Sequence, residues 1–304
     1  MATYLTLDGG TTNTRLYLVE DGRITHSLAL PVGVGRTEGD VYRRTLLQGA
    51  ERALFEWEVS PDRITAFLAS GMVTSERGLS EVPHLPCPAG LCELHRGLVP
   101  VSFPELSFPV TLIPGVKKAG MIAEATDMMR GEETEVMGLG AEGIVILPGS
   151  HNKVIRVEGG RILDFVTLMT GEMIAALTGH TILSHAVTLE AESDPFSLVR
   201  GAKAAERLGL AAALFKTRIL ATQFAATPEE TLGYFLGCLL SEEVRAVEKM
   251  APRKKTPVTV AGKAALKRPL ALLLRERGFA VTEADEEAVA SATALGAVRI
   301  FEGE

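Results

Sequence analysis

Cysteine is scarce in this 304-residue chain, which contains only Cys87, Cys92 and Cys238. Three thiols cannot build a disulfide framework. No second cysteine pair and no histidine cluster completes a zinc site with Cys87 and Cys92. Because reduced thiols are typical of the cytoplasm, we expect a cytoplasmic protein. A chain of this length can bury its core without disulfides or metals, and it suffices for two lobes.

Long apolar runs and an excess of basic residues are also missing. Asp8 interrupts the first apolar run, which argues against a signal peptide. Lys216 and Arg218 interrupt the apolar stretch 208–226, so we expect no membrane span. The 31 basic and 38 acidic side chains give a net charge of −7, whereas nucleic-acid binding needs a basic face. A small anionic ligand stays compatible with this charge, because a pocket can be locally basic.

Two common nucleotide-binding motifs, GxxxxGK[ST] and GxGxxG after a strand, are absent. In their place, an arrangement of strand, glycine turn, strand, hairpin turn and strand occurs twice, about 140 residues apart. The predicted strands are 3–8, 14–19 and 23–29 in the first copy and 143–148, 153–157 and 161–166 in the second. Such a duplication predicts an α/β protein of two lobes with a cleft between them.

The remaining pattern completes these lobes. Apolar periodicity predicts helices at 41–58, 126–140, most of 170–250, 264–277 and 286–301. Strands are predicted at 64–70, 257–261 and 279–283, and the segment 75–109 is predicted to be irregular. We therefore expect an N-terminal lobe of residues 1–140, a C-terminal lobe of residues 141–285, and a last helix, 286–304, that packs back on the first lobe.

The first chemical motif runs from Asp8 to Arg15. A carboxylate at a strand end is followed by Gly9 and Gly10, which let the backbone approach a phosphate, and then by the hydroxyls of Thr11 and Thr12. Asp8 is suited to hold Mg²⁺ through water. A plain hairpin turn explains the same residues.

The second motif, LPGSHNK at 147–153, occupies the equivalent place in the second copy. Gly149, Ser150 and His151 supply donors, and Lys153 adds a cation. Two such turns predict a pair of phosphate contacts, which favours nucleotide binding over two unrelated turns.

Two further motifs are weaker alone. Glu132 and Glu133 beside Arg130 form a carboxylate pair able to position a hydroxyl and take its proton, although a solvated helix start explains such a pair equally. In residues 258–263, a strand ends at Ala261 and Gly262, small residues suited to a nearby adenine ring.

These four motifs follow the order typical of the actin–hexokinase–chaperone ATPase superfamily. Within it, the chain resembles the 2-dehydro-3-deoxygalactonokinase family over nearly its full length. MRGEET at 129–134, LPGSHNK at 147–153 and DFVTLMTGE at 164–172 carry the resemblance. The chain departs from the family where Gly9 replaces a frequent Trp, where Asn152 replaces a frequent Cys, and at 263–265, where hydroxyl residues usually follow the adenosine turn.

The resemblance implies a two-lobed actin-like (ribonuclease H-like) ATPase fold. It implies transfer of the ATP γ-phosphate, with Mg²⁺, to the 6-hydroxyl of 2-dehydro-3-deoxy-D-galactonate in galactonate catabolism. Asp8 would organise Mg²⁺, and Glu133 or Glu132 would act as the base. Phosphates would meet both glycine turns, and the adenosine would meet Ala261 and Gly262.

The sugar acid carries a carboxylate, which favours a bidentate guanidinium. Arg15, Arg36 and Arg130 are the candidates, and Asp164 and Glu172 are expected to line the cleft floor.

Three alternatives stay open: a kinase acting on an amino sugar, pantothenate or 2-keto-3-deoxygluconate, a polyphosphate phosphatase, and a nucleotide-binding actin-like protein without turnover. The sequence does not decide between galacto and gluco stereochemistry or between a monomer and a homodimer.

Overall fold

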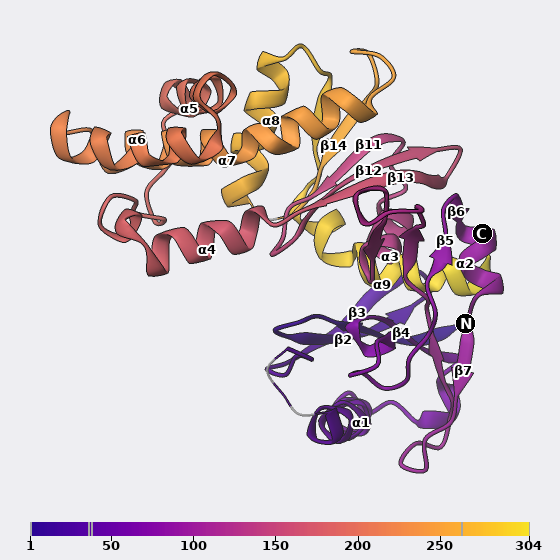
Figure 1. Ribbon diagram of the computed structural model, residues 1–304. Coiled ribbons are helices and arrows are strands. Elements are labelled where there is room, and N and C mark those ends of the chain that lie inside the picture. The colour runs from indigo at the N-terminus through magenta and orange to yellow at the C-terminus, as the bar shows by residue number, and fades with distance from the viewer. Residues whose placement is uncertain (1, 36, 38, 263, 304) are drawn as a thin grey trace. The chain divides into compact units, whose positions relative to one another are not determined.

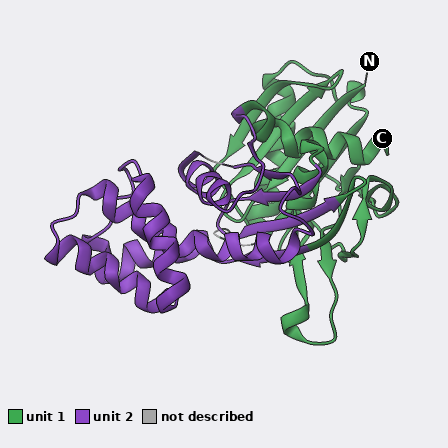
Figure 2. Cartoon of the chain, turned by 90° about the horizontal axis from the view of Figure 1, so that it is seen from above, with its two compact units in different colours: residues 1–141, 158–164, 287–304 green, residues 142–157, 165–286 purple. Residues whose placement is uncertain are grey.

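The computed structural model describes every residue except 1, 36, 38, 263 and 304 (Figure 1). The chain divides into two compact units (Figure 2). Unit 1 comprises residues 1–141, 158–164 and 287–304, and unit 2 comprises residues 142–157 and 165–286. The expected lobes had placed residues 158–164 in the second unit, whereas their contacts group them with the first.

Unit 1 is built on a six-stranded sheet of order β3-β2-β1-β4-β8-β7. Its strands are β1 (Thr3–Gly9), β2 (Thr14–Glu20), β3 (Arg23–Leu30), β4 (Ala66–Gly71), β7 (Val99–Val101) and β8 (Val110–Leu112). The first three strands are antiparallel neighbours, as the duplication predicted, and β4 lies parallel to β1. Apolar residues alternate along β1 and β2, so Leu5, Leu7, Leu16 and Leu18 share one buried cluster with helix α1 (Gly39–Glu56).

A second, three-stranded sheet of order β10-β9-β5 completes the strands of unit 1. It comprises β5 (Leu85–Pro86), β9 (Val116–Lys118) and β10 (Asp127–Met129). The predicted helix 126–140 is wrong at its start, because β10 pairs with β9 and helix α3 begins only at Glu132 (Glu132–Leu139). Gly131, at a φ of +110°, makes the change from strand to helix. The segment predicted to be irregular also holds short elements, β6 (Ala89–Gly90) and α2 (Leu91–Arg96).

The C-terminal helix α9 (Glu286–Glu302) packs closely against α3. A Cβ on Gly138 would overlap the carbonyl oxygen of Ala292, and one on Gly296 would overlap that of Thr134, so both glycines are needed for the approach. Arg299 Nη1 donates to the carbonyl of Met137 at 2.5 Å. The last helix thus fixes the position of α3 within unit 1.

Unit 2 contains a mixed sheet in the order β15-β14-β11-β12-β13. Its strands are β11 (Gly143–Leu147), β12 (Asn152–Glu158), β13 (Arg161–Leu168), β14 (Val258–Val260) and β15 (Val281–Glu283). The first two residues of β13, Arg161 and Ile162, also pair with β6. The strands β11, β14 and β15 are parallel, while β12 is antiparallel to β11.

Helices make up the rest of unit 2: α4 (Thr170–His180), α5 (Pro195–Leu208), α6 (Leu210–Gln223), α7 (Pro228–Met250) and α8 (Ala264–Glu276). Helix α7 begins at Pro228. Thr227 Oγ1 accepts from the backbone N–H of Glu230, whose carboxylate accepts from the N–H of Thr227.

Short 3-10 helices occur in both units, at Pro61–Arg63, Met72–Thr74 and Ala123–Ala125 in unit 1 and at Ile182–His185 in unit 2.

Within the described residues, no helix combines the length and apolar character needed to cross a membrane.

Candidate active site

The first glycine turn, residues 9–13, joins β1 to β2 in unit 1. Asp8 ends the strand directly before it and pairs in register with Arg15 on β2. The backbone N–H of Gly10 donates to the carbonyl of Asn13 at 2.9 Å, which closes the turn. A Cβ on Gly9 would overlap the side chain of Val73, so the close packing behind the turn requires glycine there. Asp8 and the exposed Thr11 therefore sit on a tightly defined support.

Three carboxyl groups meet beside this turn: Asp8, Glu132 and Glu135. Burial raises the pKa of Asp8 to about 6; Arg15 opposes the rise and Glu132 adds to it. Burial, followed by the charges of Asp8 and Glu132, raises the pKa of Glu135 to about 8. Glu135 was missed in the sequence, although its spacing of three from Glu132 places both on one face of α3. Burial and mutual repulsion thus oppose ionisation of these groups, and a bound cation would favour it.

Glu132 and Glu133 are neighbours in sequence but differ in environment. Glu133 is fully buried, and both its carboxylate oxygens accept from the backbone N–H of Gly131, at 2.8 and 2.9 Å. Burial, with the charge of Glu132 second, raises the pKa of Glu133 to about 8. Glu132 is only half-buried, and its Oε2 accepts from the N–H of Arg130 at 3.0 Å. Only Glu132 of this pair presents surface to a bound molecule.

The candidate arginines also differ. Arg130 Nη1 donates to the carbonyl and Oγ1 of Thr74, at 2.7 and 2.5 Å, and Nη2 lies 3.1 Å from the carbonyl of Val82. Its guanidinium thus holds two loop segments together. Arg15 is exposed on β2, and Arg36 lies outside the described residues.

Asp164 is placed in unit 1, where its Oδ1 lies 2.6 Å from Nζ of Lys118 on β9. Asp164 thus forms an ion pair with Lys118. Its role in lining a substrate site stays a prediction.

The second glycine turn, residues 148–151, joins β11 to β12 in unit 2. The backbone N–H of Gly149 donates to Oδ1 of Asn152 at 2.9 Å, and Nδ2 of Asn152 donates to Oε1 of Glu243 at 2.8 Å. Thr170 Oγ1 also donates to this oxygen. Glu243 is fully buried on α7, and burial raises its pKa, while the bonds from Thr170 and Asn152 lower it. A chain of hydrogen bonds thus supports the turn from behind.

Helix α4 braces the same turn from its other side. A Cβ on Gly171 would overlap the carbonyl oxygen of Gly149, so only glycine permits this contact. The N–H of Glu172 donates to the carbonyl of Ser150 at 3.1 Å. The Nε2 of His151 lies 3.1 Å from Oε1 of Glu172. Ser150 is exposed, while Lys153 is only 4% exposed and lies under the turn rather than on its surface.

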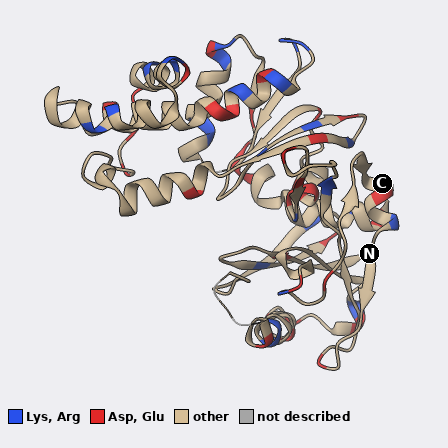
Figure 3. Cartoon of the chain, viewed as in Figure 1, with Lys and Arg blue, Asp and Glu red and all other residues tan. Residues whose placement is uncertain are grey.

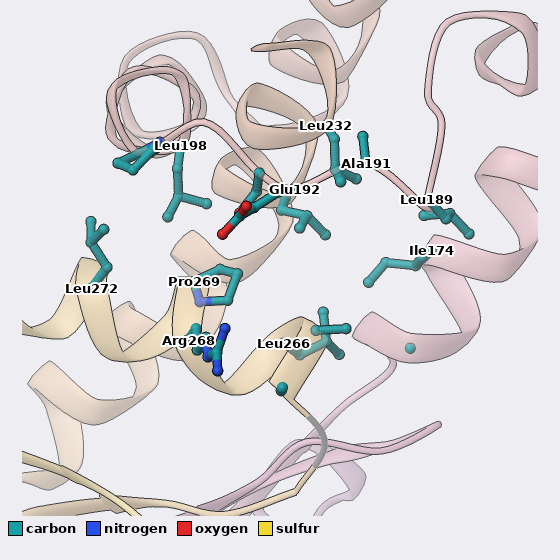
Figure 4. A pocket seen from close by; sticks show the side chains of 16 residues that line it. Ile174, Leu189, Ala191, Glu192, Leu198, Leu232, Leu266, Arg268, Pro269 and Leu272 are labelled. Atoms are coloured by element: carbon teal, nitrogen blue, oxygen red, sulfur yellow. The ribbon is translucent and has the colours of Figure 1, made fainter. Parts of the chain in front are cut away.

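A cavity of about 680 Å³ opens in unit 2 beside Gly171 (Figure 4). Its walls are mostly aliphatic, from Ile174 on α4 to Leu266 and Pro269 on α8. Of the residues that the structure describes, Glu192 and Arg268 are the charged ones in this lining. The predicted adenosine residues, Ala261 and Gly262, come shortly before α8, and the first residue of α8, Ala264, lines the cavity. Ala261 is buried, and Gly262, at a φ of +85°, lies against Pro148.

No cluster of three or more His, Cys, Asp or Glu side chains with the geometry of a metal site occurs among the described residues. A magnesium ion at Asp8 would therefore rely on water and on phosphate oxygens for most of its ligands, as Mg²⁺ commonly does.

A family model described as 2-keto-3-deoxy-galactonokinase matches residues 8–298. The chain belongs to the 2-keto-3-deoxy-galactonokinase family. The predicted family is therefore confirmed, and the enzyme class, a phosphotransferase, follows from membership of this kinase family.

Relatives agree with this membership. The chain is 27% identical over 303 residues to the 2-dehydro-3-deoxygalactonokinase of Escherichia coli K12, covering 97% of this chain and 96% of the relative. It is 32% identical over 200 residues to a protein of Rhizobium meliloti strain 1021 provisionally given the same name. That match covers 64% of this chain and spans 61% of the relative's length.

Solved structures show the fold of this family member. A Sinorhizobium meliloti protein provisionally assigned as a 2-dehydro-3-deoxygalactonokinase superposes with a TM-score of 0.81 at 22% identity, over 98% of this chain and 97% of that one. The activator of 2-hydroxyisocaproyl-CoA dehydratase from Clostridium difficile superposes with a TM-score of 0.54 at 14% identity, over 99% and 95% of the two chains. The predicted actin-like ATPase fold is confirmed.

Proposed function

We propose that this protein transfers the γ-phosphate of ATP to the 6-hydroxyl of 2-dehydro-3-deoxy-D-galactonate. The family match supports the reaction class. The geometry that carries the proposal is the meeting of Asp8, at the end of β1, with Glu132, at the start of α3. Phosphoryl transfer needs a cation beside the phosphates and a group that orients the acceptor hydroxyl, and these two carboxylates are suited to those tasks.

Glu132 is the group we propose as the base. A base must come within hydrogen-bond reach of the hydroxyl that it deprotonates, and Glu132 is half-buried whereas Glu133 is wholly enclosed. Glu133 instead fixes the first turn of α3 by accepting from Gly131. Because the transition state of phosphoryl transfer is loose, Glu132 mainly needs to hold the hydroxyl in line.

Asp8 is the residue that we propose to hold Mg²⁺. A bound magnesium ion supplies positive charge that neutralises phosphate oxygens. Burial and the nearby Glu132 raise the pKa values of Asp8 and Glu135. A divalent cation would relieve the repulsion between their ionised forms, whereas a bare phosphate would add to it. Thr11 and Thr12 remain the proposed donors to phosphate in unit 1. Gly9 and Gly10 are proposed to let the phosphate approach the backbone, since the N–H of Gly10 is engaged with Asn13.

Unit 2 is proposed to contact the nucleotide through the second glycine turn and the adjoining cavity. Gly149 and Ser150 are exposed, and His151 is half-buried beside them. Because the N–H of Gly149 is engaged with Asn152, we propose that Gly149 gives a phosphate close access to the backbone and that Ser150 and His151 supply the donors. Gly171 touches this turn and also lines the 680 Å³ cavity, whose aliphatic walls suit an adenine ring. Ala261 and Gly262 shape the entry to α8, and Lys153 contributes its charge from beneath the turn.

The substrate carboxylate is proposed to meet an arginine. Arg15 is the described candidate with an exposed guanidinium, since the donors of Arg130 are engaged with Thr74 and Val82. Arg36 remains a prediction, as do cytoplasmic location and a homodimer.

The test is a coupled assay of ADP release with ATP and Mg²⁺. The acceptors are 2-dehydro-3-deoxy-galactonate, its gluconate epimer, N-acetylglucosamine, pantothenate and none. We expect fast turnover with the galacto acid that depends on Mg²⁺. Turnover with a neutral sugar alone would contradict the acid-kinase proposal. Silence with every acceptor would favour an actin-like protein that binds nucleotide without turnover.

A further inference from the structure

A second cavity, of about 490 Å³, lies in unit 2 between α5 and α6, with Tyr234 of α7 in its lining. Its volume falls within the range of small-molecule sites. None of its lining residues is shared with the 680 Å³ cavity or with the glycine turns. A ligand in this cavity would therefore not occupy the cavity and the turn that we propose for the nucleotide.

Basic side chains dominate the charge of this cavity. Arg200, Lys203 and Arg207 are three and four residues apart on α5, so they project from one face of the helix. Lys216 adds a fourth cation from α6. Figure 3 shows basic residues along both helices. The described lining contains no Asp or Glu, in a chain whose net charge is −7.

These cations are not neutralised by neighbouring acids. Among the described residues, no carboxylate forms an ion pair with Lys203, Arg207 or Lys216, and Glu206, next to Arg207, pairs with Arg277 instead. The four basic residues of the lining are exposed, so water and salt weaken their mutual repulsion without removing it. A bound anion would turn that repulsion into attraction, which makes an anion the natural occupant.

The rest of the lining is apolar and partly aromatic. Ile219, Leu220 and Phe224 come from α6 and its end, and Phe224 is 72% exposed. The Arg200 guanidinium lies 5.5 Å from the centre of the Tyr234 ring, in cation–π contact. A planar apolar group could cover Phe224 while its charged end meets the basic side chains. Inorganic phosphate alone would leave this apolar wall in water.

The two cavities of unit 2 differ in this respect. Among the described residues, the lining of the 680 Å³ cavity contains one guanidinium, from Arg268, and one carboxylate, from Glu192. The 490 Å³ cavity has cations without a carboxylate. We propose that it is a binding site for an organic phosphate that carries a planar ring, the chemistry of nucleoside monophosphates and aryl phosphates. Guanidinium and ammonium groups recognise such a dianion by charge-assisted hydrogen bonds.

The test uses fluorescence from the cavity itself. The chain has one tryptophan, Trp57, in unit 1, so a Trp57→Phe, Phe224→Trp double variant reports only from the cavity. Phenyl phosphate is titrated into this protein, with benzyl alcohol (ring without charge) and inorganic phosphate (charge without ring) in parallel. We expect saturable binding of phenyl phosphate that is roughly tenfold or more tighter than that of either partial probe.

Charge reversal then locates the site. Adding Lys203→Glu and Arg207→Glu is expected to weaken phenyl phosphate binding by roughly a hundredfold, at about one decade for each lost charge-assisted contact. The matched control reverses Lys249 and Lys255, two exposed lysines outside the lining, and should leave the affinity unchanged. Circular dichroism checks that every variant is folded. Equal affinity before and after the Lys203 and Arg207 reversals, or equal affinity for benzyl alcohol, would overturn the proposal. Its failure leaves the kinase assay unaffected, so the two proposals are tested separately.

Discussion

The two glycine turns of this protein share a backbone plan but differ in what stands behind them. Behind the first turn, Asp8 meets Glu132 and Glu135, and the pKa values of Asp8 and Glu135 are raised to about 6 and about 8. Behind the second turn, Glu243 accepts hydrogen bonds from Asn152 and Thr170 at one oxygen. The first carboxylates remain available to a cation or a hydroxyl, whereas Glu243 serves to hold the turn.

This difference teaches how a repeated hairpin can divide the work of one reaction. The backbone of both copies offers N–H groups at a tight turn, which suit phosphate oxygens. The carboxylates behind the first turn remain available to a ligand, whereas the carboxylate behind the second is engaged in holding the turn. We therefore expect the first turn to depend on charge and the second on shape.

The largest effect is expected at the first turn. Glu132→Gln should lower kcat by roughly 10²–10⁴-fold, because a positioned base contributes about that much. Glu133→Gln keeps an oxygen that can accept from Gly131, so it should retain most of the activity. Steady-state ADP release measures both. Equal losses in the two variants would remove the distinction that burial suggests, and a larger loss in Glu133→Gln would reverse it.

At the second turn the sharpest change is steric. Gly171→Ala would drive a methyl group into the carbonyl of Gly149, so the turn must shift. A displacement of about 1 Å can cost about 100-fold in kcat/KM, and we expect a loss of that order for ATP. Gly179→Ala on the same helix is the control, since nothing lies within 4 Å of its Cβ. An unchanged kcat/KM in Gly171→Ala would show that the turn does not contact ATP.

A smaller effect is expected from Glu243→Gln. Glu243 Oε2 has no hydrogen-bond partner among the described residues, so the new amide NH₂ would be a buried donor without an acceptor. We expect the KM for ATP to rise about fivefold, equivalent to about 1 kcal/mol, while kcat changes little. Glu242→Gln, on the neighbouring half-buried position, is the control. A fall in kcat without a change in KM would contradict a role in holding the turn.

The smallest effect concerns stability against pH. Asp8, Glu133 and Glu135 have pKa values raised by folding, to about 6, 8 and 8, so the folded state binds more protons than the unfolded one. The stabilisation that these three groups contribute is therefore fully present below their unfolded pKa values near 4, and it is lost as pH rises through 6 to 8. Without Mg²⁺, the thermal midpoint should fall from pH 5 to pH 8.5, by about 2–4 °C per kcal/mol lost. Glu135→Gln should flatten this slope, while the exposed Glu124→Gln should not. A midpoint that rises with pH would contradict the prediction.

Much of the fold could be predicted because its signals are local. Apolar alternation and glycine turns located both hairpins. The region around β10 could not be predicted in the same way. Asp127–Met129 becomes a strand because it pairs with Val116–Lys118, and no local periodicity records such pairing.

Only those parts of the candidate site that are built from residues adjacent in the sequence could be predicted. Sequence motifs indicated Asp8, Glu132 and the second turn, since their chemistry is written in adjacent residues. Glu243 acts on Asn152 from 91 residues away, and Gly171 is required by a contact with Gly149 that exists only after folding. Likewise, nothing in the sequence distinguishes Glu132 from Glu133, because burial separates them.

The packing of α9 on α3 has a consequence for which substitutions can reach the candidate site. Arg299 bonds to Met137 from 162 residues away, and Gly296 lets α9 approach the carbonyl of Thr134. The position of Glu132 on α3 therefore depends on residues that take no part in the chemistry. A substitution at Gly296 that pushes the two helices apart is expected to silence the enzyme while leaving Asp8 and Glu132 themselves unchanged.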